Sequence, residues 1–184
     1  MFSDLSWIFW CLAILLVALS FYVICYKIHQ SLRVVFKPFQ KGKTYWCRII
    51  AVSDGDTVTC KRFNLRGSQT KLRLAYIDAP ESSQKYGIDA RNILKKMLEG
   101  KIVRVQIQNS DRYGRHIAVI HARGKNVNEE MLKLGAAWVY EDYIKDINHL
   151  KHLNQLQAQA KKKQKGLWQY NRPIHPSLYR KQNS

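Results

Sequence analysis

An uncharged run of 22 residues, Leu5–Tyr26, constrains this chain more than any other feature of its sequence. As an α-helix the run would be about 33 Å long at roughly 1.5 Å per residue, which suffices for a bilayer core of about 30 Å. Trp7 and Trp10 lie near its start and Tyr22 and Tyr26 near its end, and such side chains favour the membrane interfaces. The run therefore predicts a single N-terminal transmembrane helix.

Two other interpretations of this segment fit less well. A cleaved signal peptide needs a basic start and a short apolar core, whereas residues 1–6 hold Asp4 as their one charged group and the apolar run is long. A buried helix of a soluble domain needs a polar stripe, which the run lacks. We therefore expect an uncleaved anchor over residues 1–26, followed by a basic linker over residues 27–43 that rests on anionic lipid headgroups.

The charge balance indicates a polyanionic partner. The 184 residues include 31 Lys and Arg against 13 Asp and Glu, which gives a formal net charge of +18. Such a surplus is typical of proteins that bind nucleic acid or an anionic membrane face. Four Cys are too few for a disulfide scaffold, and without a Cys-x-x-Cys pair a zinc ribbon is excluded. Cys47 and Cys60 flank the first expected hairpin, and the sequence leaves open whether they are bridged.

Beyond residue 43 the pattern changes to alternating apolar and polar residues, which predicts short strands. Asp54-Gly55, between the first two strands, is a strong hairpin signal. Helices are expected where apolar residues recur at intervals of three and four. The expected strands are Thr44–Val52, Thr57–Lys61, Lys71–Ile77, Lys101–Ile107 and His116–Ala122, and the expected helices are Tyr86–Leu98, one from Asn126 to Gly135, and one marked by Leu150 to Ala160.

This order of elements, β-β-β-α-β-β-α-α, predicts a mainly β, α+β domain. Five short strands with an inserted helix suit a small closed barrel of the oligonucleotide-binding (OB) type. We expect this five-stranded OB barrel, with about three packed helices, to occupy residues 44–170. Residues 171–184 are then expected to form a basic C-terminal tail.

Acidic residues gather in three short motifs, each at a strand end or a turn. They are D-G-D-T at Asp54–Thr57, R-L-A-Y-I-D-A-P-E at Arg73–Glu81 and D-R-Y-G-R at Asp111–Arg115. Taken singly, each motif is commonly no more than a turn or a strand exit. In a small barrel the strand ends can converge, so the three motifs together predict one site.

The acidic residues of these motifs suit metal-assisted chemistry. Asp56 and Asp78 supply hard carboxylate oxygens, which together with a backbone carbonyl and waters can hold Ca²⁺. Glu81 lies just past the bend at Pro80, where it is free to hold a water and to act as a general base. The motifs therefore predict a cation next to a base.

The basic and aromatic residues suit a phosphodiester substrate. Arg73 and Arg115 are forked donors that match phosphate oxygens bidentately and can neutralise charge in a transition state. Tyr113, which lies between them in a turn, offers a stacking face for a base. We therefore predict Arg73, Glu81 and Arg115 as catalytic residues and Tyr113 as a nucleic-acid contact.

The three motifs, in this order on this strand pattern, resemble the staphylococcal-nuclease-like (thermonuclease) family. The resemblance extends from about Thr44 to Trp168 and does not include residues 1–40. It implies a five-stranded OB barrel with three helices that cuts DNA and RNA with Ca²⁺. Carried over by position, it implies that the catalytic residues are Arg73, Glu81 and Arg115 and that Ca²⁺ is bound by Asp56, Asp78 and the carbonyl of Ala79.

The chain departs from the family's pattern in three places. The best-known member has Thr where Ala79 stands, but the contribution there is largely the backbone oxygen, so Ala79 keeps the site. The connection Ser82–Lys85 is short where that member has a longer loop, which alters substrate access. The aromatic residues after Gly135 also differ, so Tyr140 and Tyr143 are only weak candidates for base contacts.

We therefore predict a monomeric, single-pass membrane nuclease that depends on Ca²⁺ and cuts DNA and RNA without sequence preference. The alternative is a catalytically silent OB module that only binds nucleic acid at the membrane, and the complete set of arginines and carboxylates argues against it. The basic residues that follow the apolar run place the domain on the cytoplasmic side. A nonspecific nuclease that needs Ca²⁺ suits the outside better, so the sequence leaves the side open.

Overall fold

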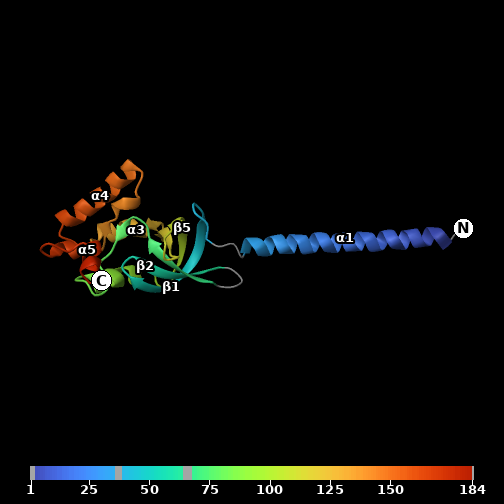
Figure 1. Cartoon of the computed structure of the whole chain (residues 1–184), viewed down its shortest axis with the longest axis horizontal. Coiled ribbons are helices and arrows are strands. Elements are labelled where there is room, and N and C mark those ends of the chain that lie inside the picture. Colours follow the sequence, from blue (N-terminus) through green and yellow to red (C-terminus); the bar gives the residue numbers. More distant parts are fainter. Residues whose placement is uncertain (1–2, 36–38, 64–67, 184) are drawn as a thin grey trace. The chain divides into compact units, whose positions relative to one another are not determined.

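The computed structural model describes residues 3–35, 39–63 and 68–183, and the chain divides into two compact units (Figure 1). One unit is the N-terminal helix, and the other is the domain that begins at Phe39. The division falls close to the point where the alternating pattern of the sequence begins.

Helix α1 (Ser3–Val35) makes up the first unit. Its stretch Leu12–His29 has a mean hydropathy of 2.0 and none of it is buried, so the helix is long and apolar enough to span a membrane. The helix extends past the apolar run because residues 27–35 contain neither Gly nor Pro to end it. The first part of the expected linker is therefore helical.

The second unit is a closed barrel of five strands. They are ordered β3-β2-β1-β5-β6 with antiparallel neighbours, and a parallel pairing between β3 and β6 closes the sheet. This confirms the predicted OB barrel. The barrel strands are β1 (Thr44–Asp54), β2 (Thr57–Arg62), β3 (Gln69–Leu74), β5 (Ile102–Ser110) and β6 (His116–Ala122), and the short strands are β4 (Ile77–Asp78), β7 (Lys125–Asn126) and β8 (Trp138–Val139).

The predicted third strand, Lys71–Ile77, is interrupted in the structure. Strand β3 ends at Leu74, and Tyr76 has a φ of 67°, in the left-handed region. The N–H of Ala75 donates to the carbonyl of Ala118 (2.8 Å), so that the chain leaves the pairing with β2 at this point. After the corner β4 pairs with β8 instead.

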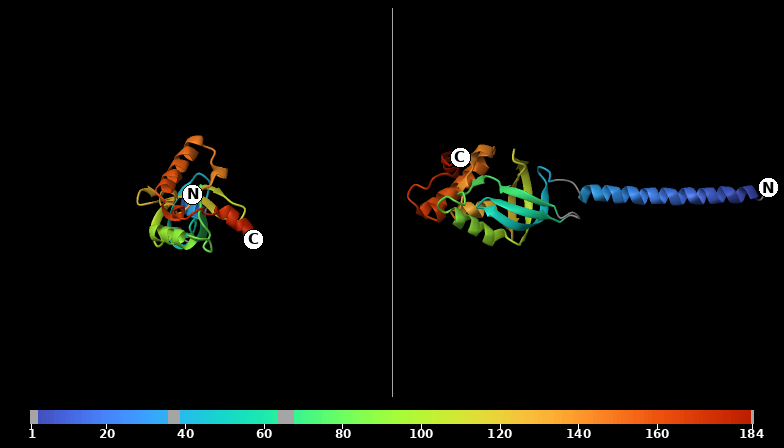
Figure 2. Two further views of the ribbon diagram at one scale, coloured as in Figure 1. Left: turned by 90° about the vertical axis from the view of Figure 1, so that its left-hand side faces the viewer. Right: turned by 60° about the horizontal axis from the view of Figure 1, so that its bottom comes forward.

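The helices pack outside the barrel (Figure 2). Helix α2 lies against β1, and α4 lies against α3. Asn126 caps α3 by accepting from the N–H groups of Asn128 and Glu129, so the helix begins where the sequence predicts it. Asp146 caps α4, which therefore begins before Leu150. The helices are α2 (Gly87–Leu98), α3 (Val127–Lys133), α4 (Ile147–Lys162) and α5 (Pro176–Gln182), with 3₁₀ turns η1 (Glu141–Tyr143) and η2 (Gly166–Gln169).

The core fills the barrel and the space beneath the helices. Its largest fully buried side chains are Ile49, Leu72, Leu74, Ile77, Leu94, Leu98, Ile107, Ile120, Met131, Leu132, Leu153 and Leu167. The apolar positions at helical spacing in α4 face this core, with Leu153, Leu156 and Ala160 buried. Cys47 and Cys60 are also buried there, and both are free thiols.

One buried polar side chain ties the corner after β3 to the rest of the fold. Asn128, 3% exposed, accepts a hydrogen bond from the N–H of Ile120 (3.1 Å). Its amide donates to the carbonyls of Ala75 (2.9 Å) and Ala118 (3.1 Å). Asn128 thereby fixes α3 against β6 and holds the corner from which Asp78 projects.

Residues 171–184, expected to be a tail, contain helix α5, which is folded onto the domain. Its phenol Tyr179 donates to the carbonyl of Ser83 (3.1 Å), and Gln84 donates to the carbonyl of Ile174 (2.6 Å). The His175-Pro176 pair starts the helix, because the His ring accepts from the N–H of Ser177 and Pro fits the first turn.

Candidate active site

The first two acidic motifs meet at the D-G-D-T turn between β1 and β2. Gly55 makes this meeting possible, since a Cβ there would lie 2.7 Å from the Cβ of Ala79. The N–H of Ala79 donates to Asp56 Oδ2 (2.9 Å), and the N–H of Leu74 donates to the Asp56 carbonyl (2.8 Å). The turn is therefore bonded to both ends of the second motif.

Arg73 lies between the two buried aspartates. Its Nη1 contacts Asp56 Oδ1, and its Nη2 lies 2.7 Å from Asp78 Oδ1. The side chains of Asp56 and Asp78 are 6% and 0% exposed, and that of Arg73 is 16% exposed. Burial alone would lower the pKa of Arg73, but the two carboxylates raise it above its ordinary value. The guanidinium therefore remains charged between them.

Glu81 stands at the start of a tight loop that leads into α2. The N–H of Gln84 donates to the Glu81 carbonyl (2.8 Å), and the N–H of Glu81 donates to Gln84 Oε1 (3.2 Å). Gly87 lets the loop close, because a Cβ there would lie 1.7 Å from the Glu81 carbonyl oxygen. The Glu81 side chain is 34% exposed, so its carboxylate reaches solvent at the edge of the buried pair.

Arg180, from helix α5, joins this cluster, although no motif in the sequence predicts it. Its Nη1 lies 2.7 Å from Glu81 Oε1, and its Nη2 lies 2.9 Å from Asp78 Oδ2. Burial would lower the pKa of Arg180, but hydrogen bonds to Asp78 and Glu81 raise it well above its ordinary value. Nothing in the residue spacing relates position 180 to position 78. The local sequence feature in this region is the His175-Pro176 pair, which indicates the start of a helix.

The third motif forms the turn between β5 and β6. Asp111 holds this turn, accepting from the N–H groups of Tyr113 (2.9 Å) and Arg115 (3.0 Å), and its Oδ2 pairs with Arg115 Nε at 2.8 Å. Burial would raise the pKa of Asp111, but the hydrogen bonds from Arg115 and Tyr113 hold it below its ordinary value. Tyr113 is 68% exposed, and the Arg115 Cζ lies 5.6 Å from its ring centroid.

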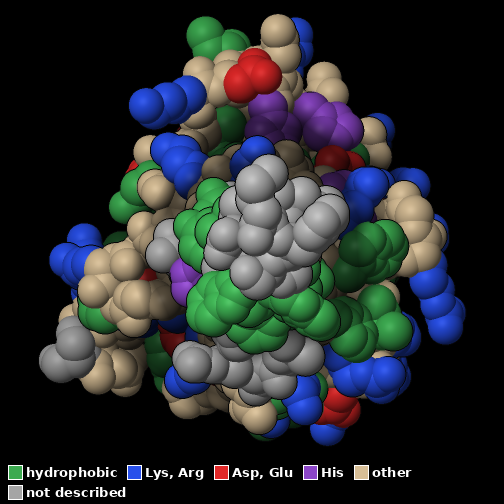
Figure 3. Space-filling view, turned by 90° about the vertical axis from the view of Figure 1, so that its right-hand side faces the viewer, with side chains coloured by type: hydrophobic (Ala, Val, Ile, Leu, Met, Phe, Trp, Pro, Cys, Tyr) green, Lys and Arg blue, Asp and Glu red, His purple; other side chains and the backbone are tan. Residues whose placement is uncertain are grey.

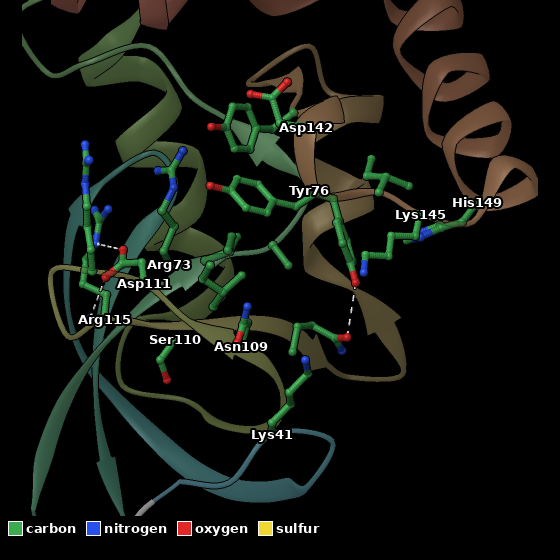
Figure 4. Close-up of a pocket in the computed structure, with 18 of the residues that line it drawn as sticks. Lys41, Arg73, Tyr76, Asn109, Ser110, Asp111, Arg115, Asp142, Lys145 and His149 are labelled. Carbon is green, nitrogen blue, oxygen red and sulfur yellow. Dashed lines mark hydrogen bonds and ion pairs between the residues drawn. The ribbon is translucent and has the colours of Figure 1, made fainter.

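A pocket of about 840 Å³ connects the third motif to Arg73. Arg73 and Arg115 both line it, with Tyr113 beside them, and Figure 4 shows Arg73, Asp111 and Arg115 toward one side and Lys145 and His149 toward the other. Its further aromatic lining residues are Tyr76, Tyr140 and Tyr143. The pocket thus presents cationic forks and aromatic rings to the same space.

The structure therefore arranges the predicted residues in two connected groups. Arg73, Asp56, Asp78 and Ala79 form one bonded cluster, and Arg180 links Glu81 to it through Asp78. Arg115 and Tyr113 lie on a separate turn and share the pocket with Arg73, which belongs to both groups. Tyr140 and Tyr143 also line this pocket, so their position agrees with the weak expectation of a base contact.

The closed barrel thus brings together buried carboxylates, arginines and an aromatic pocket, groups that suit a phosphodiester substrate. The family model described as "Staphylococcal nuclease homologue" matches residues 71–170, which is more than half of the chain. The chain belongs to the staphylococcal nuclease family, and this confirms the predicted relationship and the assignment as a nuclease.

Similar proteins from bacteria and a plant support the same assignment. An uncharacterized endonuclease of Haemophilus influenzae is 42% identical over 137 residues, which cover 74% of this chain and 73% of that protein. An uncharacterized endonuclease of Escherichia coli is 38% identical over 134 residues, covering 72% of this chain and 83% of that protein. The staphylococcal-like nuclease CAN1 of Arabidopsis thaliana is 42% identical over 111 residues, covering 60% of this chain and 33% of that protein.

Proposed function

We propose that this chain is a membrane-anchored, Ca²⁺-dependent nuclease that hydrolyses phosphodiester bonds of DNA and RNA without sequence preference. The observation that carries the proposal is the bonded cluster of Arg73, Asp56 and Asp78 with Glu81 at its solvent edge. Helix α1 is the anchor, because its apolar stretch is long enough to cross a bilayer.

The residues present suit a Ca²⁺ site in which only two of the ligands are carboxylates. Within the described residues no three His, Cys, Asp or Glu side chains form a metal-binding group. Asp56 and Asp78 would therefore hold the ion together with the Ala79 carbonyl and waters, a set of hard oxygens that Ca²⁺ accepts in flexible geometry. The two buried carboxylates carry one negative charge more than Arg73 compensates, so the pair still attracts a cation. When bound, the ion would polarise the phosphoryl group as a Lewis acid.

The remaining chemistry falls to the protein's own side chains. Glu81 accepts the proton of the attacking water, whose oxygen forms the new bond to phosphorus while the bond to the leaving oxygen breaks. Arg73 and Arg115 donate in parallel to the phosphate oxygens on which negative charge develops. Tyr113 and the aromatic residues of the pocket stack against the neighbouring base. Catalysis therefore depends on bringing the two groups of residues onto one phosphate.

The breadth of substrate follows from charge rather than from base contacts. The formal net charge is +18, and Figure 3 shows Lys and Arg side chains spread over one face on which Asp and Glu are few. Contacts to phosphate carry no sequence information, and stacking tolerates every base. Binding should therefore weaken steeply with salt and show little sequence preference.

The test is cleavage by the full chain in detergent, with plasmid DNA and single-stranded RNA, in Ca²⁺ or in EGTA. Glu81→Gln should bind DNA and lose cleavage by at least about 10²-fold, because it removes the base while keeping the shape. Glu99→Gln is the matched control, since this exposed side chain pairs with Lys95 outside the site. Normal cleavage by Glu81→Gln, or DNA binding without cleavage by the unmodified chain, would contradict the proposal.

A further inference from the structure

Arg180 engages the two groups on which the proposed chemistry most depends. It bonds Asp78, a proposed Ca²⁺ ligand, and Glu81, the proposed base, with one guanidinium. It comes from α5, which lies almost one hundred residues further along the chain. Neither the barrel nor the turn motifs require this contact.

Both carboxylate oxygens of Asp78 and one of Glu81 accept hydrogen bonds from guanidinium N–H groups. Asp78 Oδ1 accepts from Arg73 (2.7 Å) and Arg180 (3.3 Å), and Asp78 Oδ2 accepts from Arg180 (2.9 Å). Glu81 Oε1 accepts from Arg180 at 2.7 Å. A Ca²⁺ ion binds carboxylate oxygens at about 2.4 Å, so that ion and guanidinium compete as cations for the same oxygens.

The same contact engages the base. Glu81 Oε1 accepts a hydrogen bond from Arg180 at 2.7 Å, so this oxygen is not available to accept from an attacking water. Arg180 therefore weakens both metal binding and proton abstraction for as long as it stays in place.

Helix α5 is attached in a way that allows it to leave. Of its seven residues Pro176 is the buried one, and the apolar side chains of Ile174 and Leu178 are 48% and 53% exposed. Its other attachments are polar contacts of Tyr179 and Ile174 with the loop after Glu81, and the packing of His175 on the Trp138 ring. Segments with so little buried apolar surface open at low free energy.

We propose that helix α5 is an autoinhibitory latch, in which Arg180 holds Asp78 and Glu81 until Ca²⁺ and a phosphodiester displace it. The inference rests on the proposed function, since it assigns the latch to the proposed metal ligand and base. It follows that the latch sets the Ca²⁺ concentration at which the nuclease becomes active. With Arg180 bound to Asp78 and Glu81, the nuclease stays inactive at low Ca²⁺ concentrations.

The test compares Ca²⁺ binding by the full chain in detergent with that of Arg180→Gln, using isothermal titration with CaCl₂ alone. Arg180→Gln should lower the dissociation constant about two- to fivefold, the size expected for removing a partly exposed competing cation. Lys181→Gln is the matched control, because it removes one charge from the same helix at an exposed position and should change the constant less than twofold. Asp78→Asn should abolish the binding.

Hydrogen exchange of the α5 amides supplies a second readout that does not involve activity. In the unmodified chain Ca²⁺ should accelerate exchange of residues 177–182 while the barrel strands stay protected, and in Arg180→Gln exchange should be fast without Ca²⁺. Protection of the barrel strands in the same data shows that the variant is folded.

The outcomes separate the latch from the nuclease proposal. Asp78-dependent Ca²⁺ binding that is equal in the unmodified chain and in Arg180→Gln overturns the latch alone. Cleavage that falls in Arg180→Gln at saturating Ca²⁺ makes Arg180 a phosphate-binding residue and also overturns it. Absence of Ca²⁺ binding in both proteins overturns the Ca²⁺ dependence together with the latch.

Discussion

Removing the guanidinium of Arg73 should unfold the barrel more easily when Ca²⁺ is absent. Arg73→Met keeps a side chain of similar length but leaves Asp56, 6% exposed, without a cation. Asp56 would retain its hydrogen bonds from Thr57 Oγ1 and the N–H of Ala79, each 2.9 Å long. Asp78 would retain Arg180, so the loss falls mainly on Asp56.

The size of the effect follows from this arrangement. Removing one partner of a buried ion pair costs about 3–5 kcal/mol of unfolding free energy. Because Asp78 keeps its pair with Arg180, we expect a loss near the lower end, about 3 kcal/mol. With a urea dependence of about 2 kcal/mol per molar, the midpoint of unfolding should fall by about 1.5 M. The unfolding transition in EGTA can be followed by the fluorescence of Trp138 and Trp168, whose ring centroids lie 4.3 Å apart.

Ca²⁺ should reverse part of this loss, because the ion supplies the positive charge that the substitution removes. At one hundred times its dissociation constant, a ligand stabilises the folded state by about 2.7 kcal/mol, and the variant should gain more from a given Ca²⁺ concentration than the unmodified chain. Arg104→Met, on an exposed position of β5, should shift unfolding by no more than about 0.5 kcal/mol. Equal urea midpoints for Arg73→Met and the unmodified chain in EGTA would refute the reasoning.

Two further predictions concern the stability of the domain. Asn128→Ala removes three buried hydrogen bonds and should lower the free energy of unfolding by roughly 2–4 kcal/mol, as measured in urea; a loss below 1 kcal/mol would mean that the corner after β3 is held by other contacts. Burial lowers the pKa of His116, His121 and His175 from 6.5, so the unfolded chain binds more protons than the folded one as the pH falls below that value. Stability should therefore be complete above pH 6.5 and decline toward pH 5 in urea titrations, and a stability that rises over this range would contradict these directions.

Local features of the sequence were enough to predict most of the elements and to single out the three motifs. The apolar run predicts α1, and alternation, turn residues and caps such as Asn126 predict the strands and helices, because each depends on neighbouring residues. The order of the three motifs was enough to indicate the family, which the comparisons confirm. The roles assigned to Arg73, Glu81 and Arg115 stay predictions until cleavage is measured.

The tertiary structure decided what depends on residues far apart in the chain. The parallel pairing of β3 with β6 closes the barrel, and the break at Tyr76 follows from hydrogen bonds that Ala75 makes to Ala118 and Asn128. The approach of Arg180 to Asp78 and Glu81 is of the same kind. Hydrophobic periodicity reports which face of a helix or strand is buried. It holds no information about which distant charged residue will lie opposite a given carboxylate. From the sequence alone, position 180 could therefore be assigned only to a basic tail.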